Sequence, residues 1–163
     1  MARTWSTTAA FDAAAGRLLE VMTDESFVVE QHRLDEAVID AELREVSRTP
    51  TRLVQEIRAT EYGRGLTGLD RSKRERSTVT FDWDLPAMRC AWSYAGEHGG
   101  RVKVRGEDRI EAAGDRARLT STWHVEVRIP LVGGQVEKLV LKEVEKDRPK
   151  YEALLRRHLA ARA

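Results

Sequence analysis

The chain has 163 residues, which suits one domain and is long enough to bury a core of its own. Apolar residues make up 41% and charged residues 34%, and the formal net charge is +1, so no overall field draws in nucleic acid or an anionic membrane. The only cysteine is Cys90, which excludes an intrachain disulfide and fits a reducing compartment. No signal peptide and no apolar run of about 20 residues is visible. We therefore expect a single cytoplasmic domain over residues 1–163, with no nucleic-acid partner and no membrane segment.

The first part of the chain predicts one strand and two short helices. Residues 3–11 alternate between apolar and polar side chains, which is typical of a half-buried strand. Asp12 is expected to cap a short helix that begins at Ala13. Asp24 is expected to cap a second short helix, over residues 25–32. Two short helices in succession suit a corner of the fold.

Six alternating segments follow, separated by short turns, and this pattern predicts an antiparallel meander with one buried face. The segments cover residues 38–48, 52–62, 76–85, 88–96, 101–112 and 116–131. The polar stretch from Gly63 to Lys73 is predicted to be a flexible loop that could gate a binding site. Its "GRGLTG" matches a dinucleotide-binding pattern, but no helix follows to meet the phosphates, so we reject that function. Its basic run "DRSKRER" lacks interleaved aromatic residues and predicts a solvated surface.

The C-terminal part predicts one long helix. Gly133 and Gly134 let the chain leave the last strand sharply. An apolar stripe at three-four spacing should then pack on the sheet. The stripe consists of Val136, Val140, Val144, Tyr151, Leu154, Leu155 and His158. Pro149 lies inside this helix and should bend or interrupt it, because proline cannot donate an amide hydrogen bond.

The order of these elements resembles the START-like, or helix-grip, superfamily, also known as SRPBCC, which includes polyketide cyclases and lipid-transfer domains. The step "PLVGGQVEK" from Pro130 to Lys138 and the segment "LLEVMTDESF" from Leu18 to Phe27 are similar to an uncharacterised bacterial branch. The resemblance implies an α+β fold in which about seven antiparallel strands, in β-α-α-β6-α order, curve around the C-terminal helix. It also implies a cavity between sheet and helix that binds a hydrophobic or amphipathic small molecule, such as a lipid or a polyketide-like compound.

Candidate ligand-binding residues follow from the predicted faces. The aromatic and helical residues expected to line the cavity are Phe81, Trp83, Trp92, Tyr94, Trp123, Val136, Leu139, Val140 and Val144. The alternative for each aromatic residue is ordinary core packing. Glu45 shares the face of Leu43 and is a possible polar pocket residue, unless the strand end is already at the solvent rim.

The sequence assigns no metal, no cofactor and no catalytic residue. No histidine lies at metal-binding spacing to another ligand, and the H-x-E at His124 lacks the cysteine partners of a zinc deaminase. These observations favour binding over catalysis. A cyclase or hydratase-type enzyme of the same superfamily stays open, with Glu45, Tyr94 or His124 as acid or base. The other alternative is a protein-interaction module, such as a chaperone activator, with a filled core and an exposed apolar patch.

Overall fold

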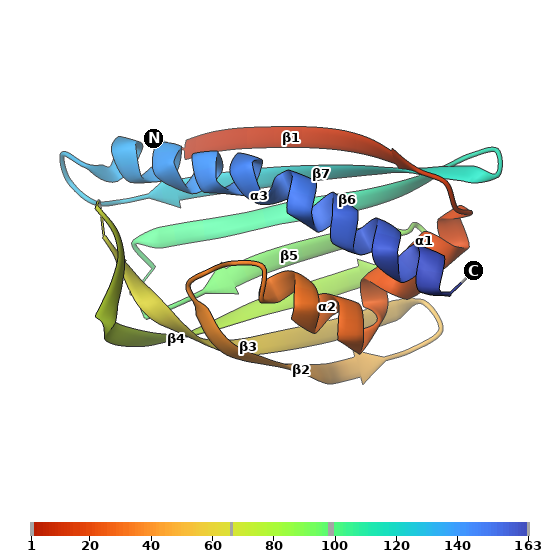
Figure 1. The fold of residues 1–163 in the computed structure, drawn as a ribbon, viewed down its shortest axis with the longest axis horizontal. Helices are drawn as coiled ribbons and strands as arrows, with labels where there is room; N and C mark the ends of the chain where they lie inside the picture. Colours follow the sequence, from red (N-terminus) through yellow and green to blue (C-terminus); the bar gives the residue numbers. More distant parts are fainter. Residues whose placement is uncertain (1, 66, 98–99, 163) are drawn as a thin grey trace.

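The computed structural model describes residues 2–65, 67–97 and 100–162, and Figure 1 shows their arrangement. Seven strands form one antiparallel sheet, in the order β1-β7-β6-β5-β4-β3-β2. The elements are β1 (Ala2–Phe11), α1 (Ala15–Thr23), α2 (Glu25–His32), β2 (Val38–Arg48), β3 (Arg52–Gly65), β4 (Gly68–Asp84), β5 (Arg89–Ala95), β6 (Val102–Ala113), β7 (Arg116–Val127) and α3 (Gly133–Ala161). The predicted α+β helix-grip architecture is confirmed.

The three helices cover one face of the sheet, which we call the inner face (Figure 1). The long helix α3 lies against β1 and β7, and its C-terminal half also contacts α1 and α2. Side chains alternate between the two faces of each strand, so every second residue points inward. Leu53, Ile57 and Leu119 are fully buried on the inner face, and Leu155 is fully buried on α3. The core therefore lies between the sheet and the three helices.

Two helix starts were predicted, and one is correct. Asp24 caps α2, because its carboxylate accepts a hydrogen bond from the backbone N–H of Ser26 at 3.1 Å. Asp12 does not cap α1, which begins two residues later than predicted, with Ala14 as an N-cap that makes no side-chain bond. Phe11 explains the delay, since it is fully buried at the end of β1 and the chain needs residues 12–14 to turn away from the sheet.

The prediction of a flexible loop from Gly63 to Lys73 is wrong. The strands β3 and β4 continue through this segment as a hairpin, with a bulge between Tyr62 and Gly63. Leu66 lies outside the described residues. Most of this end of the hairpin is exposed on both faces, so its sequence carries no apolar alternation from which a strand could be recognised.

Pro149 does not interrupt α3, which is helical from Gly133 to Ala161. Figure 1 shows that the helix changes direction between its ends. A proline inside a helix costs about 3 kcal/mol. Burial of Leu154 and Leu155, five and six residues after it, offsets this cost, since each buried leucine contributes roughly 1.5–3 kcal/mol.

Candidate functional site

The N-terminal end of α3 is fixed to the end of β7. Glu137 is fully buried, and its carboxylate accepts a hydrogen bond from the backbone N–H of Val127 at 2.8 Å. Gly133 sits so close to the same residue that a Cβ there would lie 2.3 Å from the Val127 carbonyl oxygen. Gly133 and Glu137 both belong to the segment from Pro130 to Lys138, whose sequence resembles the uncharacterised bacterial branch. This segment therefore has a structural role, which is to set where α3 begins relative to the sheet.

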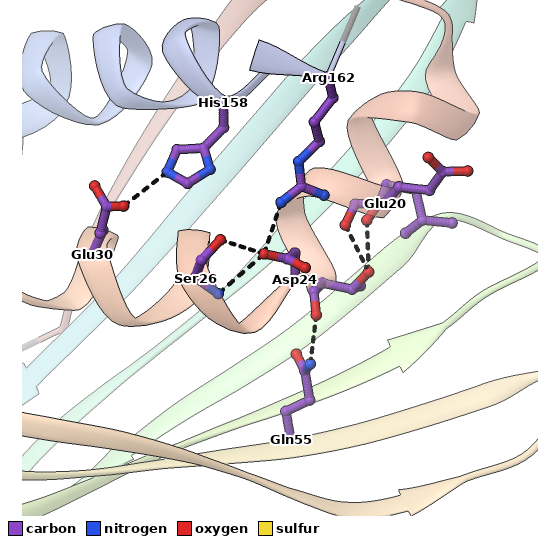
Figure 2. A network of polar contacts seen from close by, with 9 residues as sticks. Glu20, Asp24, Ser26, Glu30, Gln55, His158 and Arg162 are labelled. Carbon is purple, nitrogen blue, oxygen red and sulfur yellow. Dashed lines mark hydrogen bonds and ion pairs between the residues drawn. The ribbon is translucent and has the colours of Figure 1, made fainter. Parts of the chain in front are cut away.

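The C-terminal end of α3 is fixed to the junction of α1 and α2 (Figure 2). His158 lies 3.3 Å from the carboxylate of Glu30 on α2, and Arg162 forms an ion pair with Asp24 at 2.7 Å. From the sheet, the Gln55 side chain donates a hydrogen bond to the carbonyl of Thr23 at 2.8 Å. The helix is thus held at both ends, and its middle spans the inner face between them.

An aromatic set occupies the inner face of the central strands. Its members are the five aromatic residues predicted from the sequence, namely Phe81, Trp83, Trp92, Tyr94 and Trp123. Trp92 and Trp123 stand edge to face with ring centroids 4.4 Å apart. Gly106 lies between them on β6, and a Cβ there would meet the Trp92 ring at 2.3 Å. The absence of a side chain at Gly106 is what lets the two indoles meet.

A polar cluster lies beside this aromatic set, one inward-facing position along the strands. We define the polar cluster as Asp108 on β6, Ser121 on β7, and Arg148 and Tyr151 on α3. The Ser121 hydroxyl donates to Oδ1 of Asp108 at 2.6 Å and accepts from Nη2 of Arg148 at 3.0 Å. The guanidinium of Arg148 lies over the Tyr151 ring, 4.3 Å from its centroid. The cluster therefore joins the sheet to the middle of α3 through polar contacts.

The electrostatics of the polar cluster follow from its depth. Burial raises the pKa of Asp108, and the hydrogen bond from Ser121 and the charge of Arg148 oppose that rise. Burial, reinforced by Asp108, raises the pKa of the Tyr151 hydroxyl. Burial, again with Asp108, raises the pKa of the neighbouring Cys90 thiol, as expected for an inert cysteine. The carboxyl group is thus biased towards its neutral form in a site that also holds a guanidinium.

Two members of the polar cluster keep accessible surface. Asp108 and Tyr151 are surrounded by protein, yet both keep part of their surface accessible. Phe81 and Trp123, on the same inner face, are also only partly buried. Protein interiors are close-packed, so partial accessibility at these positions sets them apart from the fully buried core around Leu53, Ile57 and Leu119. An arrangement of this kind can bind the polar end of a molecule and enclose its apolar body.

The polar cluster was not predicted from the sequence, although its members follow the predicted periodicities. Asp108 lies four residues after Val104 on β6, and Ser121 lies between Leu119 and Trp123 on β7, so both share the face of these apolar residues. Arg148 falls four residues after Val144 on the helix stripe. The spacing alone therefore places Asp108, Ser121 and Arg148 on inward-facing positions. A polar residue within an apolar stripe is the signal that could have identified them as candidate binding residues.

Other predicted site residues lie elsewhere. Glu45 lies opposite Gln55 on the inner face of the edge strand β2, but it is about half exposed and pairs with Arg48 at 2.7 Å, so it stands at the solvent rim. Leu139 is 42% exposed, because it lies off the inward stripe of α3, whereas Val136, Val140 and Val144 are partly buried. The predicted placement of Leu139 in the cavity lining is therefore wrong.

His124, the least favoured acid or base candidate, lies on the outer face of the sheet. Its ring nitrogen Nδ1 is 3.1 Å from the hydroxyl of Thr4 on β1. It alternates with the inward-facing Trp123, so it cannot reach the space beneath α3. Tyr94, by contrast, is on the inner face, and burial raises the pKa of its hydroxyl.

A hollow of about 660 Å³ opens on the outer face of the sheet, and Asp108 of the polar cluster is among the residues that line it. Its lining is mostly charged and hydroxyl side chains, together with edges of the strands. The lining residues are Thr51, Arg52, Asp82, Trp83, Asp84, Arg89, Cys90, Ala91, Glu107, Asp108, Arg109, Thr120 and Thr122. Two of its charges already pair with each other, since Arg52 binds Asp82 through two hydrogen bonds of 2.9 and 2.7 Å. This hollow is open and Arg52 and Asp82 already neutralise each other in it, so the inner face is the stronger candidate.

Two further properties concern the described residues alone. No group of three or more histidine, cysteine, aspartate or glutamate side chains among them is arranged to hold a metal ion. None of the helices in residues 2–65, 67–97 and 100–162 is both long and apolar enough to cross a membrane.

Solved structures with this fold come from several kinds of protein. The protein TTHA0849 from Thermus thermophilus matches with a TM-score of 0.66 and 18% identity, over 99% of each chain. The Zhui aromatase/cyclase from Streptomyces sp. R1128 matches with a TM-score of 0.60 and 16% identity, over 99% of this chain and 93% of that one. A START superfamily protein from Mycobacterium smegmatis matches with a TM-score of 0.58 and 17% identity, over 98% and 99%. At these identities the matches show a shared START-like, helix-grip fold.

Sequence comparison identifies the family. No curated protein matches the chain in sequence. One family model, described as a protein of unknown function (DUF2505), matches residues 6–159, which is nearly the whole chain. The chain therefore belongs to the DUF2505 family, within the START-like fold.

Proposed function

We propose that this protein binds a hydrophobic or amphipathic small molecule, of lipid or polyketide-like character, between the inner face of the sheet and α3. The observation that supports this most is the accessible surface retained by deep residues of the polar cluster beside the aromatic set. Burying apolar ligand surface there would contribute about 25 cal/mol per Å². The indoles of Trp92 and Trp123 would supply shape and stacking, and the polar cluster would orient the ligand.

Two proteins of similar structure support the same class of function. One of them is an aromatase/cyclase and another a START superfamily protein. The helix residues Val136, Val140 and Val144 would then cover the ligand from above, and Phe81, Trp83 and Tyr94 would complete the wall below.

Intrinsic fluorescence tests the proposal directly, because all four tryptophans lie on inward-facing positions of the sheet. Titration with fatty acids, fatty alcohols and polycyclic aromatic compounds should give a saturable change with at least one class. No response to any of them, together with a crystal structure in which side chains fill the inner space, would refute the proposal.

A matched pair of helix variants locates the site. Val144→Ser removes apolar surface from the partly buried stripe of α3, and Leu139→Ser makes the same kind of change on its exposed side. At about 0.8 kcal/mol per buried CH₂, the first variant should weaken binding roughly fourfold or more, while the second leaves it unchanged. Equal effects of the two variants would contradict the proposed position.

A second candidate function is catalysis on the bound molecule, and the polar cluster is the observation that favours it. Asp108, biased towards its neutral form beside Tyr151, has the character of a general acid. The test is Asp108→Asn, which should preserve ligand binding and abolish turnover of a cyclisable or hydratable ligand. Turnover that survives this substitution would exclude Asp108 as the acid.

A further inference from the structure

Arg148 has an unusual position for an arginine. Only 9% of its surface is exposed, although a guanidinium carries five N–H donors and a full charge. Its one hydrogen bond within the described residues goes to the Ser121 hydroxyl, and its Nε is buried without a hydrogen-bond partner. A buried cation is costly unless an anion and further acceptors surround it. The arrangement therefore lacks an acceptor.

The protein does not supply that acceptor from Asp108. The Asp108 carboxyl reaches Arg148 only through the bridging Ser121 hydroxyl, and the described residues contain no direct ion pair between the two. Burial also raises the pKa of Asp108, so it is a poor counter-ion for the guanidinium. The Tyr151 ring offers its face to Arg148, and a ring face does not act as an in-plane acceptor for the N–H donors at the edge of the guanidinium.

The donors point to the chemistry of the ligand. A guanidinium presents its N–H groups as a planar fork that matches the two oxygens of a carboxylate. One guanidinium neutralises one negative charge, and a dianionic phosphate would leave a second buried charge unpaired, so a monoanion suits the site better. The aromatic pair of Trp92 and Trp123 begins one inward-facing position away, which is about 7 Å along the strand.

We propose that the ligand is a carboxylate-bearing amphipathic molecule, with Arg148 binding the carboxylate and the apolar body lying against Trp92 and Trp123. This inference rests on the function proposed above and adds the class of the head group. It assigns Arg148 a role in ligand selection, because an alcohol or hydrocarbon of the same shape would leave the guanidinium without its acceptor.

The test compares pairs of probes that differ only in the head group. The first pair is decanoate and 1-decanol, and the second is 1-naphthylacetate and 2-(1-naphthyl)ethanol. Affinities are measured by calorimetry at pH 7.5 for the wild type, Arg148→Gln and the control Lys150→Gln, which changes an exposed cation two residues along the same helix. The wild type should bind at least one acid about tenfold or more tightly than its alcohol. Arg148→Gln should remove this preference and leave alcohol binding within threefold, and Lys150→Gln should change neither.

The outcomes separate the two proposals. If an alcohol binds and the acid binds no more tightly, or if Arg148→Gln weakens both members of a pair equally, the carboxylate inference is overturned and the binding function stands. If no probe binds, the carboxylate inference is overturned, and the fluorescence titration and crystal structure described above decide whether the binding function stands.

A measurement on the wild type alone covers the case in which Arg148→Gln does not fold. The carboxyl carbon of ¹³C-labelled acid, titrated by NMR in the complex, should show a pKa below that of the free acid, because the adjacent guanidinium favours the ionised form. An unchanged or raised pKa in the bound acid would overturn the inference.

Discussion

Replacing either of the two consecutive glycines at the start of α3 by alanine should have opposite effects on the stability of the protein. A Cβ on Gly133 would lie 2.3 Å from the Val127 carbonyl oxygen, about 1 Å inside the 3.4 Å at which ordinary contact begins, whereas a Cβ on Gly134 meets nothing within 4 Å. The carbonyl cannot easily yield, because Val127 is 3% exposed and its N–H is bonded to Glu137. Gly133→Ala should therefore destabilise the protein by about 1–3 kcal/mol, as overpacking does.

For a chain of this length each kcal/mol corresponds to about 2–4 °C in Tm, so Gly133→Ala should lower the Tm by roughly 2–12 °C. Gly134→Ala should leave the Tm unchanged or raise it by up to about 4 °C, because alanine favours the helix by up to about 1 kcal/mol. Thermal unfolding followed by circular dichroism at 222 nm, with urea unfolding as a second measurement, compares the two. A Gly133→Ala protein as stable as the wild type would refute the steric reasoning, and so would equal losses in both variants.

Three further predictions concern the inner face and the helix start. Gly106→Ala should displace the Trp92 ring, lower stability by about 1–3 kcal/mol and change the near-ultraviolet circular dichroism, and an unaltered spectrum would contradict the tight contact. Glu61 is buried and desolvation raises its pKa, so the folded state binds a proton more readily than the unfolded state, and stability should fall as pH rises through the folded pKa. Glu61→Gln should make the free energy of unfolding less dependent on pH. The variant should be more stable than the wild type at pH 8 but not at pH 4, which urea unfolding at both pH values measures. Glu137→Ala should cost roughly 1.5–3 kcal/mol in urea unfolding, because the buried N–H of Val127 loses a charged acceptor, and a loss below 0.5 kcal/mol would argue against the bond.

Periodicity in the sequence was sufficient for most of the fold. Alternation predicted the six-stranded meander and β1, and the three-four stripe predicted α3, because each of these elements has one buried face. The β3–β4 hairpin beyond Tyr62 escaped this reasoning because its exposed residues carry no pattern. The start of α1 was misplaced because burial of Phe11, a tertiary contact, decided where the chain turns.

The candidate site was only partly predictable. The five aromatic residues lie on the predicted inner face, since their side-chain direction depends on strand period alone. The polar cluster joins residues 108, 121, 148 and 151 from three elements, and the sequence does not state that β6, β7 and the middle of α3 meet. Glu45 was singled out by the same period, yet the strand had already reached the solvent at that position.

The most direct test of the central claim is the position of a bound ligand. Intermolecular nuclear Overhauser effects, measured on the complex with 1-naphthylacetate or the tightest-binding probe, report which side chains it touches. We predict contacts from the ligand to the indole protons of Trp92 and Trp123 and to the ring of Tyr151. Contacts only to outer-face residues such as Thr120 and Thr122, which line the hollow on the other side of the sheet, would contradict a binding site beneath α3.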